Sequence, residues 1–121
     1  MRYDTSAVFH IAAKLLITLE RGNMKEGEPP KRPLFDLGQT VATPGALASL
    51  GHAEEEPLNY LLRHVTGDWG DLPEEDIEEN RRSLEQDLRI FSAYHLNTGV
   101  KIYVITEWDR SVTTILLPSE Y

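Results

Sequence analysis

The sequence predicts a single α+β domain, in which helices are followed by a three-stranded antiparallel meander. A chain of 121 residues with 40% hydrophobic residues is long and apolar enough for one ordinary core. Apolar residues recur at helical spacing up to about residue 87, in segments bounded by proline and glycine. After that point the period changes to two, and two tight-turn sequences divide the remainder into three strands.

The first element is an amphipathic helix predicted within residues 1–23, with Thr5 or Ser6 as its cap. Its apolar stripe consists of Val8, Ile11, Ala12, Leu15, Leu16 and Leu19. It is too short for a membrane span, and no small-residue cleavage site follows it, so neither a membrane segment nor a signal peptide is expected. A proline-rich linker over residues 24–33 separates it from the domain, residues 34–121. Because Met24 opens that linker, residues 1–23 are a docking helix, an upstream extension of the start site, or a helix that pairs two chains.

The domain should begin with a short strand near Gly38, followed by two or three helices that pack on the sheet. Thr43 and Pro44 predict the first of these helices, because threonine caps a helix and proline fits its first position, while Gly51 should end it. Pro57 starts the second helix in the same way. The predicted strand and helices cover residues 34–42, 43–51, 55–65 and 73–87.

The last third of the chain should form the meander. The triplet at residues 97–99 is a hairpin turn in which Gly99 can adopt a positive φ, and residues 109–111 form a second tight turn. The strands around these turns are predicted over residues 88–96, 100–108 and 112–118.

The charge of the chain lies mainly in one block. The net charge is −8, and residues 53–87 alone carry twelve acidic and three basic side chains. Such a surface repels phosphate backbones, so direct nucleic-acid binding is not expected, whereas a basic protein partner is. The alternative is a solvated helix face that serves solubility. The absence of cysteine excludes disulfides, thiolate zinc sites and cysteine nucleophiles, and it suits a reducing cytoplasm.

The stretch RHVTGDWGDLPEED, residues 63–76, concentrates polar groups around two glycines. A histidine with carboxylates could hold a metal or act in acid–base chemistry, and a second group of acids occurs in TEWDRS, residues 106–111. The catalytic candidates are therefore His64, Asp68, Glu107 and Asp109.

The same stretch also has a structural interpretation. Asp71 is placed to cap the helix that begins near Pro73, Trp69 should fill the core, and the helix dipole favours a charged His64 at a helix C-terminus. The spacing fits no established metal loop, and the chain has no P-loop, H-E-x-x-H or G-x-S-x-G motif. We therefore expect no metal and no cofactor.

The runs FDLGQTVATPGAL, RHVTGDWGDLPEED with Asn80, IFSAY and VITEWDRSVTTILLPSEY resemble a family of small proteins of bacterial plasmids and integrative elements. Its members are labelled "plasmid-related protein" or "type I restriction endonuclease subunit M". The resemblance covers roughly residues 34–121 and implies a genetic context, without an established activity. The chain lacks the glycine-rich turn and the catalytic motif of a methyltransferase, so we read the second label as inherited from gene neighbourhood.

The leading hypothesis is a non-enzymatic, cytoplasmic accessory protein of a mobile element that binds a basic protein, in counter-defence or antirestriction. The expected partner-binding residues are Tyr60, Trp69, Glu74, Glu75, Glu78 and Glu79. One alternative is a small metal-dependent hydrolase or nuclease-like enzyme that uses the four catalytic candidates. The other is a homodimeric module paired through the N-terminal helix.

Overall fold

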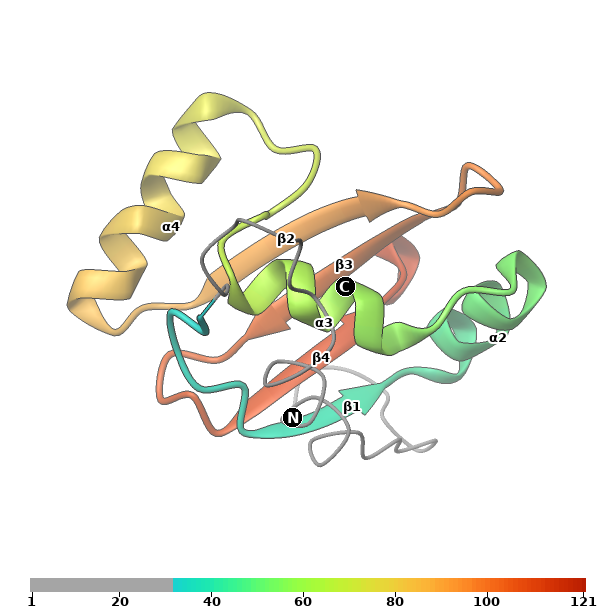
Figure 1. Cartoon of the computed structure of the whole chain (residues 1–121), viewed down its shortest axis with the longest axis horizontal. Helices are drawn as coiled ribbons and strands as arrows, with labels where there is room; N and C mark the ends of the chain where they lie inside the picture. The colour runs from blue at the N-terminus through green and yellow to red at the C-terminus, as the bar shows by residue number, and fades with distance from the viewer. Residues whose placement is uncertain (1–31) are drawn as a thin grey trace, which may run out of the picture.

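The computed structural model describes residues 32–121, so the predicted N-terminal helix and most of the linker lie outside the described residues. The described part is an α+β domain with one four-stranded mixed sheet (Figure 1), as predicted. Its elements are β1 (Gln39–Ala42), α2 (Pro44–Ala53), α3 (Pro57–Val65), α4 (Glu74–Gln86), β2 (Ile90–His95), β3 (Lys101–Thr106), β4 (Val112–Leu116) and the short 3-10 helix η1 (Pro118–Glu120).

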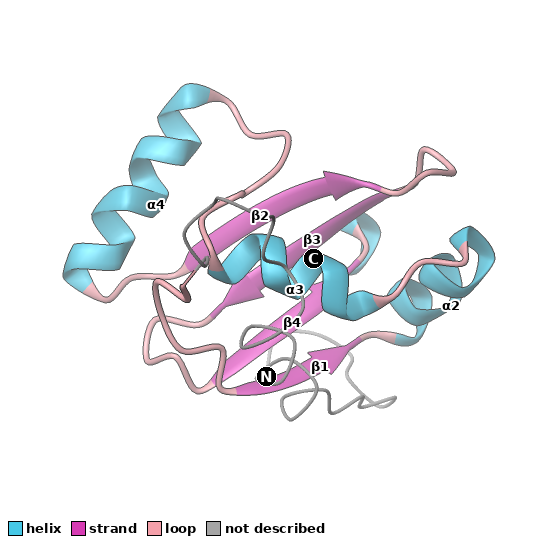
Figure 2. Cartoon of the chain, in the orientation of Figure 1, coloured by secondary structure: helices cyan, strands magenta, loops and turns pink. Residues whose placement is uncertain are grey.

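The strands lie in the order β1-β4-β3-β2 (Figure 2). β2, β3 and β4 are successive antiparallel neighbours, which confirms the predicted meander. The hairpin between β2 and β3 turns at Gly99, whose φ is +89°. β1 pairs with β4 in the parallel direction, with Val41 opposite Thr114, and so completes the sheet at its other edge.

The main core lies between one face of the sheet and the helices α2 and α3. Alternate strand residues point to this face because successive side chains of a strand alternate, and α3 crosses in front of the sheet in Figure 1. The buried side chains of this core include Leu50, Leu61, Val65, Tyr94, Ile102, Val104 and Ile115. We call this the first face of the sheet.

The start of α2 follows the sequence prediction, but its end does not. The Thr43 side chain accepts a hydrogen bond from the Ala46 amide at 3.2 Å, and Pro44 occupies the first turn. The same Thr43 hydroxyl donates to Glu120 Oε1 at 2.5 Å, which ties η1 to the start of this helix. Gly51 does not end the helix, because the chain stays helical to Ala53 and turns at Glu54, whose φ is +55°.

Gly51→Ala should therefore stabilise the domain by about 0.5–1 kcal/mol, because alanine favours a helix and restricts the unfolded chain. A Cβ at this position would meet nothing within 4 Å. Urea unfolding followed by circular dichroism measures the change. An unchanged or lower midpoint would contradict the placement of Gly51 in the helix interior.

Helix α4 lies along the β2 edge of the sheet and is held there by a polar side chain. Asn80 is only 3% exposed. Its amide donates to the Phe91 carbonyl at 2.7 Å and accepts from the Phe91 amide at 3.1 Å. These two bonds satisfy a backbone site of an edge strand that would otherwise be open to pairing. Two apolar side chains of this helix, Ile77 and Leu84, are only partly buried.

Candidate functional site

The loop between α3 and α4 is joined to the sheet by backbone hydrogen bonds. Gly70 forms a parallel bridge with Ala93, and its φ is +77°. The Ala93 amide donates to the Trp69 carbonyl at 3.1 Å, and the Asp71 amide donates to the Ala93 carbonyl at 2.7 Å. The loop therefore extends the sheet beyond β2 and is a structural part of the domain.

His64, the first catalytic candidate, lies in a chain of buried hydrogen bonds between α3 and the sheet. The Thr113 hydroxyl donates its one proton to the Leu37 carbonyl at 2.7 Å. In its 2.7 Å hydrogen bond with the Thr106 hydroxyl, Thr113 must therefore be the acceptor and Thr106 the donor. Thr106 has then used its proton and accepts from Nε2 of His64 at 2.9 Å. Nδ1 in turn accepts from the Ser92 hydroxyl at 2.6 Å. The Leu37 carbonyl, through this chain of hydrogen bonds, thus fixes the tautomer of the neutral ring, with its proton on Nε2.

The surroundings of His64 keep the ring neutral. Burial, together with the smaller effect of the positive charge of Arg110, lowers the pKa of His64 from 6.5 to about 3. Its exposed fraction is 0%, and the ring of Phe35 meets it edge-on at 5.2 Å between centroids. At this position the cost of desolvation outweighs the favourable effect that the helix dipole has on a charged imidazole. With both nitrogens bonded and no exposure, the ring has no position from which to act on a substrate.

The other catalytic candidates lie in different local environments. Asp68 Oδ2 pairs with Arg63 Nε at 2.7 Å on the surface. Asp109 Oδ1 accepts from the amide and the hydroxyl of Ser111, whose side-chain bond is the main cause that lowers the pKa of Asp109. Glu107 has one buried carboxylate oxygen, Oε2, without a hydrogen-bond partner. Within residues 32–121, no three His, Asp or Glu side chains form a group that could hold a metal ion.

Of the two structural roles predicted for this loop, the one for Trp69 is confirmed and the one for Asp71 is wrong. Trp69 is 7% exposed and lies in the core, as predicted. Asp71 does not cap α4, because its carboxylate bonds to Nδ1 of His95 at 2.7 Å and the cap position falls on Pro73, which has no side-chain cap bond. The folding of the loop onto β2 places Asp71 beside this strand.

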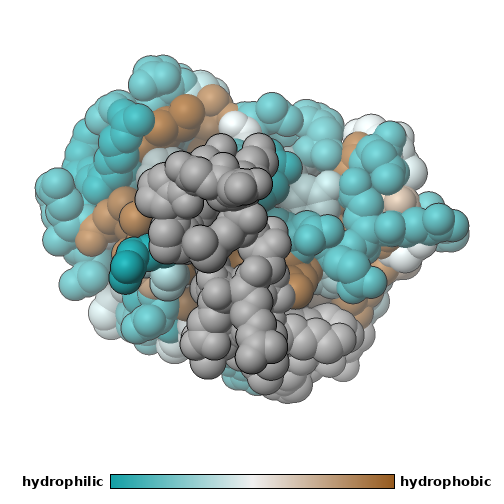
Figure 3. All heavy atoms as spheres, in the orientation of Figure 1, coloured by the Kyte–Doolittle hydropathy of each residue, from teal (hydrophilic) through white to brown (hydrophobic). Residues whose placement is uncertain are grey.

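The proposed partner-binding residues divide into buried aromatic and exposed acidic side chains. Tyr60 is 6% exposed, and its hydroxyl donates to Glu55 at 2.6 Å. Like Trp69, it therefore presents almost no surface to a partner. All four glutamates lie exposed on α4 and cover it with negative charge: Glu74, Glu75, Glu78 and Glu79. Figure 3 shows hydrophilic side chains over the outer side of this helix, at the left of the view.

Arg110 joins the C-terminal end of α4 to the turn between β3 and β4. Its guanidinium donates to the carbonyls of Ser83 at 2.9 Å, in the last turn of the helix, and Leu88 at 2.6 Å, just after the helix ends. It also donates to the carbonyls of Glu107 and Trp108 in its own turn, both at 3.2 Å. The carbonyls of Trp108 and Leu88, whose residues are 63% and 41% exposed, thereby share one guanidinium nitrogen at the end of the acidic helix.

Trp108 is the residue that sequence reasoning did not select. The sequence contains two tryptophans, and the prediction of a partner-binding residue fell on Trp69, which lies between two glycines. The available signal was the position of Trp108 directly before the tight turn at residues 109–111, where a side chain projects beyond the end of the sheet.

Arg110→Ala should lower the free energy of unfolding by about 2–3 kcal/mol, because several charge-assisted bonds to backbone carbonyls are lost together. The matched control is Arg82→Ala, since Arg82 forms an exposed pair with Glu79 at 2.8 Å whose loss should cost less than about 1 kcal/mol. Urea unfolding of both variants compares them. Equal losses would show that Arg110 does not hold the end of α4 in place.

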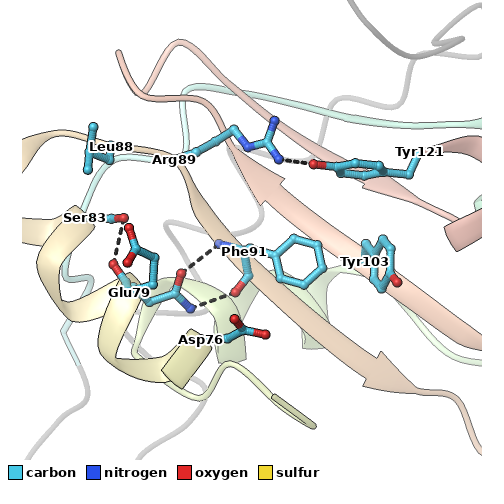
Figure 4. Close-up of a pocket in the computed structure, with 9 residues that line it drawn as sticks. Asp76, Glu79, Ser83, Leu88, Arg89, Phe91, Tyr103 and Tyr121 are labelled. Carbon is cyan, nitrogen blue, oxygen red and sulfur yellow. Dashed lines mark hydrogen bonds between the residues drawn. The ribbon is translucent and has the colours of Figure 1, made fainter. Parts of the chain in front are cut away.

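A groove of about 600 Å³ runs between α4 and the sheet, on the side opposite the main core (Figure 4). Asp76 and Glu79 line it from the helix, and the neighbouring rings of Phe91 and Tyr103, 4.7 Å apart, line it from the sheet. Tyr121 closes its far end, where its hydroxyl accepts from Arg89. Carboxylates beside aromatic faces form an environment that favours a cation.

No protein-family model, curated protein or solved structure matches the chain. Within residues 32–121, no helix is both long and apolar enough to cross a bilayer. The geometry of the α4 surface is therefore the basis for a functional proposal.

Proposed function

We propose that the chain is a non-enzymatic binding protein whose partner is a basic protein, and that the binding surface combines the acidic outer side of α4 with Trp108 and Leu88. The observation that carries this proposal is the set of hydrogen bonds by which Arg110 joins the end of α4 to the turn that contains Trp108. These bonds hold two residues with exposed apolar side chains, Trp108 and Leu88, at the end of a helix whose exposed side carries mainly carboxylates.

The charge of α4 supports a basic partner. Its two arginines form i,i+3 pairs with Glu78 and Glu79, so acids remain in excess on the helix. Exposed charges of one sign attract an oppositely charged protein and increase its association rate, while they add little to affinity.

The apolar side chains supply what charge alone does not. Tryptophan is enriched among residues that dominate binding energy, and a large exposed apolar side chain marks an interaction surface when polar groups surround it. The groove next to α4 offers a place for a lysine or arginine of the partner, with Asp76 and Glu79 on one side and Phe91 on the other.

A finer proposal follows from the resemblance to plasmid and integrative-element proteins. The partner would then be a host defence protein, such as a restriction enzyme, whose basic DNA-binding cleft accepts an acidic surface. A cytoplasmic location fits such a role and a chain without cysteine. The hydrolase alternative has no comparable support, since the residues it needs do not form a metal-binding group within residues 32–121.

Reversing charge on α4 should abolish partner binding. We expect Glu75→Lys with Glu79→Lys to lose the proteins that the wild-type chain captures from a bacterial lysate at low salt, because two repulsive charges replace two attractive ones. Trp108→Ser should weaken capture by roughly tenfold or more. Quantitative mass spectrometry of the captured proteins measures both effects.

Matched controls separate this surface from general effects. Glu54→Lys with Glu56→Lys changes the net charge equally at exposed positions outside α4, and Val100→Ser removes an apolar side chain that is 39% exposed in the other hairpin turn. Both controls should capture as the wild type does. If the α4 variant and its control capture the same proteins equally, the proposed surface is wrong.

A further inference from the structure

The face of the sheet opposite α2 and α3, which we call the second face, is also apolar. Strand register places Phe91, Ile105, Thr114 and Val41 in one row across it. Tyr103 and Leu116 form part of the next row. The sheet therefore has apolar side chains on both sides, and a sheet of this kind needs a layer on each.

The part of the second face formed by β1, β4 and the adjoining end of β3 is almost fully buried. Ile105 and Leu116 are 0% exposed, Thr114 is 1% exposed and Val41 is 3% exposed. Among the described helices, α2 and α3 contribute to the core on the first face, and α4 bonds to the β2 edge. Tyr121 packs on Tyr103 with 6.0 Å between ring centroids, toward the β2 side.

We infer that the N-terminal segment of the same chain, residues 5–23, packs its apolar stripe on the second face over β1 and β4. The stripe runs from Val8 to Leu19, which in a helix is a length of about 17 Å. The five residues of β4, at about 3.3 Å each, have a similar length of about 17 Å. The stripe and the strands that it would cover are thus matched in length as well as in apolar character.

The linker permits this arrangement. Leu34 is fixed to the domain by its amide, which donates to the Val65 carbonyl at 2.8 Å. Residues 24–33 can span roughly 33 Å when extended, which is comparable with the width of a domain of this size. Residues 1–34 carry six basic and four acidic side chains, a net charge opposite to that of the remaining chain. The same segment can therefore pass around the sheet edge and approach an acidic domain without repulsion.

Engineered thiols test this inference directly, because the chain contains no cysteine. In the full chain, Thr114→Cys should react with iodoacetamide about a hundredfold more slowly than a free thiol, as expected for a buried group. Adding Leu15→Asp with Leu16→Asp should raise that rate at least about tenfold, because two charges in the stripe prevent docking. Val41→Cys gives a second reporter on β1.

Two controls make the result specific. Lys14→Glu changes the net charge as much as the two aspartates do, but it lies on the polar side of the predicted helix and should leave the rate unchanged. Ala46→Cys lies in the main core and should stay protected in every variant, which excludes global unfolding.

Three results would overturn the inference. The first is rapid labelling of Thr114→Cys in the otherwise unchanged chain, and the second is a rate that the aspartates do not alter. The third is protection that rises with protein concentration over about a hundredfold range, which would assign the cover to a second copy of the chain.

Discussion

Acidification from pH 7 toward pH 4 should strongly destabilise this domain, because the folded state keeps His64 neutral. Its pKa is about 3 in the folded domain and 6.5 when unperturbed, so below pH 6.5 the unfolded chain binds a proton that the folded chain does not. The contribution of neutral His64 to stability is therefore fully present above pH 6.5. As the pH decreases toward 3, the free energy of unfolding falls by about 1.4 kcal/mol per pH unit and by up to about 5 kcal/mol in all. This is a large share of the stability of a typical domain, about 5–15 kcal/mol.

Urea unfolding at several pH values measures this effect, and a substitution assigns it. His64→Gln retains a donor and an acceptor but cannot titrate, so it should lower stability at pH 7 by about 1–3 kcal/mol and flatten the dependence below pH 6.5. His52→Gln, at an exposed position, should retain the wild-type dependence. A His64→Gln curve parallel to that of the wild type would show that another group controls the acid sensitivity.

Gly70→Ala should destabilise the domain by about 3–5 kcal/mol and could prevent folding, because it combines backbone strain with a steric clash. A Cβ at this position would lie 2.0 Å from the Ala93 carbonyl oxygen and 2.6 Å from Cδ1 of Tyr94. The clash involves backbone of β2, which cannot move without breaking the bridge that holds the loop. Soluble yield and the urea midpoint report the loss.

Gly99→Ala is the control that separates the two causes. Gly99 also has a positive φ, +89°, but a Cβ there would meet nothing within 4 Å. It should therefore cost only about 1 kcal/mol, which is the backbone term alone. Similar losses at Gly70 and Gly99 would mean that the close approach of the loop to β2 contributes nothing.

Local signals in the sequence were sufficient for most of the secondary structure. Thr43 and Pro44 define the start of α2 through contacts within one turn, and Gly99 defines a hairpin through its own backbone freedom. The parallel pairing of β1 with β4 could not be predicted, because it joins residues more than seventy positions apart and no local pattern encodes it. The prediction that Gly51 ends α2 was wrong for a related reason. A glycine can end a helix but need not do so, and here the left-handed conformation at the helix end is adopted by Glu54.

The candidate site was harder to predict, because exposure and hydrogen bonding depend on the whole fold. The sequence identified His64 as unusual, but its partners Ser92 and Thr106 come from β2 and β3 and carry no motif. The acidic surface of α4 followed from composition alone. Which aromatic residues are exposed to a partner could not be predicted from composition, because only the fold places Tyr60 in the core and leaves Trp108 in solvent.

A photo-crosslinking amino acid at position 108 in the full chain tests the central claim, partner binding at the α4 surface, most directly. Illumination in bacterial cells should produce a covalent adduct with another protein, and Glu75→Lys with Glu79→Lys should remove that adduct. The same amino acid at position 100, in the opposite hairpin turn, should give none. Equal adducts from both positions, or an adduct at 108 that persists after the charge reversal, would contradict the proposed surface.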